Sequence, residues 1–232
     1  MSDRSVFPTT HGTWLVTRVG DGAAADAAAA AEARAHVMQR YAEPLAAFVR
    51  GSSLARLGEP DELVNGFFAS RLSDAAFLAA WARSGMRLRR WLMNGMLFHG
   101  QGIARDCARA GARGASVDPA ELDRQIGGAP AAEADFDRAW ALAVVREATA
   151  RAEEELHAEG RARDFEIFRR HAVDGQPYAA FARDLGRTEQ QCAGATRLVA
   201  QRVRAKLAEL FVEEGVPAHE LDEEIARVRA AL

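Results

Sequence analysis

The sequence predicts an all-α fold made of two small helical domains that are joined by a flexible linker. Of the 232 residues, 51 are Ala and 29 are Arg, and both residue types favour helices. Large apolar side chains recur at spacings of three and four residues, while runs of β-branched residues are almost absent, which argues against a sheet fold. We divide the chain into an N-terminal extension (1–26), a first domain (27–113), a linker (114–135) and a second domain (136–232).

The first domain should contain four helical stretches. Apolar residues at helical spacing predict a helix that closes at Gly51, and Pro44 inside it should kink it or locally break it. A second helix should begin near Pro60, because proline suits the first turn of a helix. A third stretch is expected around residues 77–81, and a fourth from about Met86 to residue 98.

Composition changes between residues 110 and 135, where glycine, proline and alanine replace large apolar side chains. This composition predicts a flexible linker. The second domain is then expected to begin at Phe136. From there a helix should run to about His157, and Phe165 should lie on the next one. A final helix is expected from Glu220 to Leu232.

Residues 178–210 of the second domain have the pattern of a helix-turn-helix. A short helix over 178–185 ends at Gly186, where a left-handed residue costs least. Thr188 then predicts an N-cap, and Gln191, three residues later, completes a capping box. Ala182 is small enough to let the two helices approach, and Cys192 should pack back between them. The longer helix should continue to residue 210.

The polar face of this longer helix carries side chains that can read base edges or hold phosphates. The candidate DNA-binding residues here are Thr188, Gln190, Gln191, Ala193, Arg197, Gln201 and Arg204. An ordinary helical hairpin with a solvated polar face would give the same spacing, so that interpretation stays open.

A second basic stretch, residues 82–113, contains seven arginines and one acidic residue. Arginines interleaved with tryptophans suit single-stranded nucleic acid, because bases stack on aromatic rings while arginines hold phosphates. Trp91 fits a core position better, whereas Trp81 fits stacking and core about equally. Glycines at 95, 100 and 102 weaken the helix by about 1 kcal/mol each relative to alanine. The candidates here are Trp81, Arg83, Arg87, Arg89, Arg90 and Arg105.

Several classes of protein are not indicated. A formal charge of −3 excludes a uniformly basic protein that coats nucleic acid. The chain has only two cysteines, too few for a disulfide framework, which is typical of a protein from a reducing compartment. No apolar run approaches the ~20 residues of a membrane span, and no secretion signal is recognised, so we expect a cytoplasmic protein. Phosphate-binding loops, nucleophile elbows and metal-ligand spacings are lacking. We therefore expect no enzymatic activity, catalytic residue, cofactor, metal or small-molecule substrate.

A series of short motifs follows a fixed order through nearly the whole chain. These are Phe7-Pro8-Thr9-Thr10 with Trp14; Tyr41, Pro44-Leu45 and Phe48-Val49-Arg50; Glu62 to Phe68; Phe77-Leu78-Ala79; Arg87 to Leu92; Phe136 with Trp140-Ala141-Leu142; and Tyr178 to Glu189. Each motif is weak alone, but their order and spacing together are specific. On these residues the chain resembles bacterial RNA polymerase sigma factors of the extracytoplasmic-function (ECF) group, within the sigma-70 family.

The resemblance implies that the first domain is region two of such a factor and the second domain is region four. Region two would dock on the clamp helices of the largest polymerase subunit, and its arginine-rich helix would open and read the minus-ten promoter element. The longer helix of region four would enter the major groove of the minus-thirty-five element. The residues implied in polymerase binding are Glu62, Asn65, Phe68 and Arg71. Core RNA polymerase and promoter DNA are the implied partners, and an anti-sigma factor is a further candidate.

Two alternatives remain open at this point. One is a helix-turn-helix regulator that binds duplex DNA as a dimer without core polymerase. The other is a diverged sigma-like protein that binds polymerase or an anti-sigma partner without reading DNA. Capture of core polymerase followed by transcription in vitro would distinguish all three.

Overall fold

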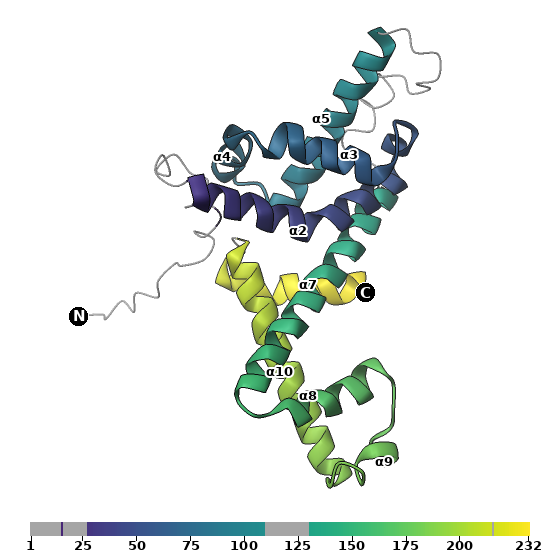
Figure 1. Cartoon of the computed structure of the whole chain (residues 1–232), viewed down its shortest axis with the longest axis vertical. Helices are drawn as coiled ribbons and strands as arrows, with labels where there is room; N and C mark the ends of the chain where they lie inside the picture. The colour runs from purple at the N-terminus through teal and green to yellow at the C-terminus, as the bar shows by residue number, and fades with distance from the viewer. Residues whose placement is uncertain (1–14, 16–26, 110–129, 215) are drawn as a thin grey trace, which may run out of the picture.

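The computed structural model describes residues 15, 27–109, 130–214 and 216–232, and these residues contain helices and no strands (Figure 1). The motif at residues 7–10, Trp14 and the linker up to residue 129 lie outside the described residues. Across the described ranges, no helix combines the length and apolarity needed to cross a bilayer. The helices are α2 (Ala27–Gly51), α3 (Pro60–Phe67), α4 (Ala75–Ser84), α5 (Leu88–Arg109), α7 (Pro130–Ala158), α8 (Ala162–Phe168), α9 (Tyr178–Phe181), α10 (Glu189–Glu213) and α11 (Leu221–Ala231).

Shorter turns connect several of these helices. Among them are η1 (Ser53–Arg56), the wider turn η2 (Phe68–Leu72), which continues α3, η3 (Arg169–Val173), which continues α8, and η4 (Ala218–Glu220) before α11. The expected all-α class is thus confirmed.

Helix α2 continues from Ala27 to Gly51, so the local break that was one of the two expectations for Pro44 does not occur. Proline removes one intrahelical hydrogen bond, but its ring is buried here and the flanking apolar face packs along the full helix. Tertiary packing therefore outweighs the local penalty. Helix α5 is likewise continuous through its three glycines.

The start of α7 corrects the boundary between linker and second domain. Residues 130–135 are helical, so α7 begins at Pro130 instead of Phe136. Pro130 occupies the first helical position, where proline is well tolerated. Ala132 is fully buried, and a Cβ at Gly51 would lie 3.0 Å from the Cα of Ala132. The end of α2 and the start of α7 therefore approach each other too closely for a larger residue at Gly51.

One hydrophobic core extends through α2, α3, α5 and α7 to the end of α10 and α11. Figure 1 shows α7 running from the upper group of helices past α10 to α8 at the lower end. Tyr41 of α2 stacks on Phe136 of α7 with ring centroids 6.3 Å apart, and Trp140 stacks on Phe211 of α10 at 5.8 Å. Residues that the sequence assigns to separate domains thus share a core.

Buried charge joins the same helices. Arg40 of α2 is 4% exposed, and its guanidinium donates to Glu147 of α7 at 2.7 Å and to Glu214, just after α10, at 2.8 Å. Beside it, Arg151 bridges Glu147 and Glu213, both at 2.7 Å. This group contributes polar contacts between three helices that are far apart in sequence.

Candidate nucleic-acid interface

The segment from α9 to α10 agrees with its sequence at the turn and at the cap, but the expected helix over 178–185 is shorter, because α9 ends at Phe181 and residues 182–186 form a turn. Gly186 adopts a left-handed conformation with φ +65°, and α10 begins directly after Thr188. The Thr188 side chain accepts from the Gln191 backbone at 3.2 Å, and the Thr188 backbone donates to the Gln191 amide oxygen at 2.8 Å. The predicted capping box is therefore confirmed.

Contacts behind α10 also agree with the sequence. Ala182 and Cys192 are buried together with Ile167 of α8 and Phe181 of α9, in a small cluster separate from the main core. Leu156, Phe165 and Val199 form a second cluster that anchors α10 on α7 and α8. The buried side of α10 is thus fixed, and its opposite side is turned outward.

Some candidate side chains on the outward side of α10 are exposed and, among the described residues, unpaired, whereas others already pair with neighbouring residues or are partly buried. Gln190, Arg197 and Gln201 are exposed, and Arg197 forms no ion pair or hydrogen bond with any side chain that the structure describes. By contrast, Thr188 and Gln191 are occupied by their mutual cap, Ala193 is half-buried, and Arg204 pairs with Asp222 at 2.7 Å. Of the two candidate arginines on this surface, Arg197 is therefore the one that no described carboxylate pairs with.

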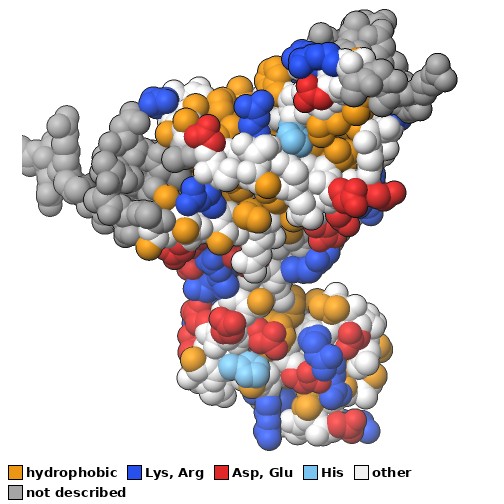
Figure 2. Space-filling view, turned by 45° about the horizontal axis from the view of Figure 1, so that its top comes forward, with side chains coloured by type: hydrophobic (Ala, Val, Ile, Leu, Met, Phe, Trp, Pro, Cys, Tyr) orange, Lys and Arg blue, Asp and Glu red, His pale blue; other side chains and the backbone are white. Residues whose placement is uncertain are grey.

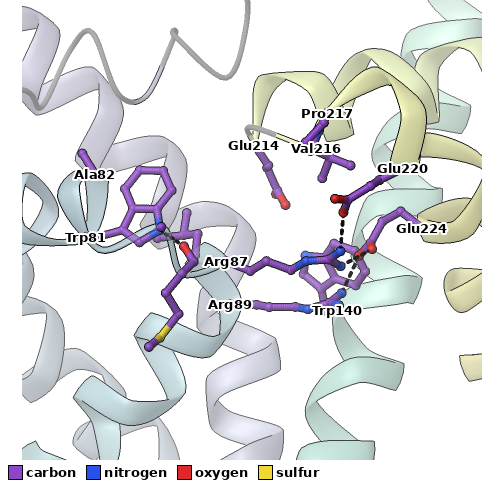
Figure 3. A pocket seen from close by; sticks show the side chains of 13 residues that line it. Trp81, Ala82, Arg87, Arg89, Trp140, Glu214, Val216, Pro217, Glu220 and Glu224 are labelled. Atoms are coloured by element: carbon purple, nitrogen blue, oxygen red, sulfur yellow. Dashed lines mark hydrogen bonds and ion pairs between the residues drawn. The ribbon is translucent and has the colours of Figure 1, made fainter.

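The arginines at the start of α5 lie against carboxylates from other helices. Arg87 pairs with Glu220 at 2.7 Å and also contacts Glu224, while Arg89 pairs with Glu224 at 2.6 Å (Figure 3). Arg89 also lies over the Trp140 ring at 4.9 Å from its centroid. In this conformation these guanidiniums are partly covered by the C-terminal part of the chain.

The other candidates of the first domain are dispersed, and on the face shown in Figure 2 the Lys and Arg side chains are scattered among acidic and hydrophobic ones. Arg90 pairs with Glu133 of α7 at 2.6 Å, whereas Arg83 and Arg105 are exposed near opposite ends of the stretch. Trp81 is only 5% exposed, and its indole N–H donates to the Met86 carbonyl at 2.8 Å. Its ring is therefore unavailable for base stacking in this conformation. Trp91 packs on Phe77 as part of the core, as expected.

A cavity of about 450 Å³ lies beside the Arg87 and Arg89 ion pairs. Trp81 and Trp140 contribute to its walls, and Glu214 and Glu220 supply carboxylates (Figure 3). Part of its lining comes from the start of α5, and part comes from the segment that follows α10.

The α3 face contains the candidate residues for polymerase binding. Glu62 and Asn65 are exposed one turn apart, and Arg71 is exposed on η2, but Phe68 is buried and serves the core. Phe98 of α5, which the sequence places among the apolar residues of its helix and not among the candidate site residues, is 54% exposed. His99, whose ring lies 3.3 Å from the Ser70 hydroxyl, was not a candidate either. Burial and the charge of Arg71 lower the pKa of His99, which favours its neutral form.

The acidic residues Glu220, Asp222 and Glu224 were not recognisable from the sequence as partners of the candidate arginines. Their clustering at the start of the last helix is a visible signal, because acidic residues favour a helix N-terminus. This preference of acidic residues for a helix N-terminus already explains the cluster. The sequence therefore held no signal that Glu220 and Glu224 would pair with Arg87 and Arg89, more than 130 residues earlier.

Within the described ranges, no group of three or more His, Cys, Asp or Glu side chains is arranged to hold a metal ion. Comparison with protein-family models, with curated proteins and with solved structures finds no match to this chain.

Proposed function

We propose that the chain is a sigma-like initiation factor that binds core RNA polymerase and contacts promoter DNA through α10. The observation that carries this proposal is the geometry of residues 178–213. A short helix, a left-handed glycine and a capped helix leave Gln190, Arg197 and Gln201 exposed on one face. Helices presented in this way fit the major groove, where Arg and Gln can each make paired hydrogen bonds to a base.

Under this proposal the chain has two functional regions, one around α3 to α5 and one helix-turn-helix around α8 to α10. The exposed residues Glu62 and Asn65 of α3 supply a polar surface for the polymerase, held in place by the buried Leu63 and Phe67. The exposed Phe98 of the nearby α5 adds an apolar contact of the kind that protein interfaces contain.

Substitution of Arg197 tests DNA reading. In the full-length chain, Arg197→Ala should weaken binding to a duplex selected from a random library by ~1–3 kcal/mol and relax the preference at one position. Binding is measured by fluorescence anisotropy on the selected and on a scrambled duplex over a salt series. Arg138→Ala on α7 removes one exposed charge elsewhere and is the matched control.

Uniform weakening on both duplexes would instead assign Arg197 to phosphate contact. If Arg197→Ala binds both duplexes as tightly as the Arg138→Ala control, DNA reading by α10 is contradicted. That result would favour the alternative of a sigma-like protein that binds polymerase or another protein partner without reading DNA. The occupied arginines of α5 are the observation that keeps this alternative open.

Substitution of Glu62 tests polymerase binding. Glu62→Arg reverses a charge on the exposed face of α3 without touching the core, so it should weaken capture of bacterial core RNA polymerase about tenfold or more. Glu154→Arg, on the exposed side of α7, controls for the change in charge. Unchanged capture with Glu62→Arg, or no capture by the unaltered chain, would contradict this docking surface. Transcription in vitro with captured polymerase then separates an initiation factor from a DNA-binding regulator.

A further inference from the structure

The C-terminal segment (residues 217–232) brings an acidic turn against arginines from two distant helices. Its carboxylates are Glu220, Asp222, Glu223 and Glu224. Three of these four side chains pair with arginines that the sequence analysis assigned to nucleic-acid binding. The contact therefore concerns the same cations that a nucleic acid would use.

The contact with α5 is the more buried of the two. Glu224 is 2% exposed and is surrounded by Arg87, Arg89 and Arg227, and Glu220 holds the other side of the Arg87 guanidinium (Figure 3). Hydrogen bonds between ionised partners are about twice as strong as neutral ones. A phosphate that approached Arg87 or Arg89 would have to replace these carboxylates.

The contact with α10 is exposed. Asp222 pairs with Arg204 at 2.7 Å, and both side chains are well over half exposed, so this pair contributes little to stability. Its position is nevertheless informative, because Asp222 and Glu224 lie in one turn. The same turn thus contacts a candidate cation of each nucleic-acid surface.

Apolar contacts hold the C-terminal segment in this position. Ile225 and Val228 of α11 are buried in the main core, which also contains Leu207 and Phe211 of α10 and Trp140 of α7. Figure 1 shows α11 crossing α7 below the upper group of helices. The segment is thus a docked helix, and its carboxylates are held at the arginines.

We propose that the C-terminal segment is an internal competitor of nucleic acid. Glu220 and Glu224 occupy the guanidiniums of Arg87 and Arg89, and a single-stranded nucleic acid binds this surface by exchanging its phosphates for these carboxylates. The proposal rests on the proposed function, since it takes the arginines of α5 to be a nucleic-acid surface. It adds a regulatory role for residues 217–232.

The test compares full-length variants on a fluorescent 20-nucleotide single-stranded DNA of mixed sequence. The double substitution Glu220→Gln and Glu224→Gln keeps the size of both side chains and removes their charge. With no carboxylates to displace from Arg87 and Arg89, the double variant should bind this strand about tenfold or more tightly at 0.1 M salt. Glu153→Gln with Glu154→Gln on α7 gives the same net charge and is the matched control.

Equal affinity of the two double variants for the single strand would overturn the proposal. Because neutralising Glu224 removes the partner of three partly covered arginines and could disturb the fold, a second measurement uses the unaltered protein. Hydrogen exchange of the α11 amides should become faster when the single-stranded DNA is added at saturation, while exchange in α2 stays the same. Unchanged or slower exchange in α11 would also overturn the proposal.

The outcomes separate this inference from the proposed function. If the Glu220 and Glu224 variant gains affinity for single strands but Arg197→Ala has no effect on duplex binding, the competitor remains and duplex reading by α10 fails. If Arg197 contributes as expected but the two double variants behave alike, only the competitor fails.

Discussion

At the scale of single residues, His36 gives the fold a dependence on pH. Burial, and then the charge of the neighbouring Arg40, lower its pKa from 6.5 to about 4, although Glu147 and Glu213 act in the opposite direction. In the unfolded chain this histidine binds a proton below pH 6.5, whereas in the folded chain it stays neutral until about pH 4. His36 therefore supports the fold above pH 6.5, and this contribution is lost as the pH falls toward 4.

We expect the free energy of unfolding to fall between pH 7.5 and pH 5 by roughly 1–2 kcal/mol more in the unaltered protein than in His36→Gln, after allowance for partial solvent exposure. Urea unfolding of both proteins at the two pH values measures this difference. Glutamine is polar but does not titrate, so the carboxylates nearby contribute to both curves alike. Parallel pH dependence in the two proteins would show that His36 is not held neutral.

At the scale of elements, the glycines of α5 have different roles along one helix. A Cβ added at Gly95 would lie 2.9 Å from Cζ of Phe77 and 3.1 Å from Cε2 of Phe67, whereas one added at Gly102 would meet nothing within 4 Å. Gly95 therefore allows α5 to approach the two phenylalanines closely. Gly102 contributes no such contact and only lowers the helix propensity.

Gly95→Ala should destabilise the protein by about 1–3 kcal/mol, because two packed rings must move. Gly102→Ala, seven residues later in the same helix, should stabilise it by roughly 0.5–1 kcal/mol. Urea denaturation followed by circular dichroism measures both, and each variant is the control for the other. A Gly95 variant as stable as the original protein would mean that the rings yield without cost.

Helices whose ends depend on local chemistry could be predicted from the sequence, and contacts between distant helices could not. The capping box at Thr188 and the turn at Gly186 depend on a few neighbouring residues, and both are confirmed. The break considered at Pro44 and the expected helix start at Phe136 were wrong, because packing between α2 and α7 outweighs local preference there. The same distinction applies to the candidate site. The exposure of Arg197 could be predicted from helical spacing, but the pairing of Arg87 with Glu220 depends on a contact between distant helices and could not.

At the scale of the whole molecule, Arg40 couples helices that the sequence places in different domains. Burial alone would lower its pKa, but Glu214 and then Glu147 raise it above the ordinary value, so Arg40 stays charged. Its two partners come from α7 and from the end of α10. The main core extends over the same boundary, so we expect α2, α7 and the end of α10 to unfold together.

Arg40→Leu should therefore lower the free energy of unfolding by about 3–5 kcal/mol, because it leaves Glu214 buried without its cation. Adding Glu214→Gln should recover part of this loss, since a neutral amide is less costly to bury than a carboxylate. Arg50→Leu, at an exposed position of the same helix, should change the stability by less than about 0.5 kcal/mol. Urea unfolding followed by circular dichroism should give one transition in every variant. A loss below about 1 kcal/mol for Arg40→Leu, or an early separate transition in the unaltered protein, would mean that the two sequence-defined domains are held together weakly.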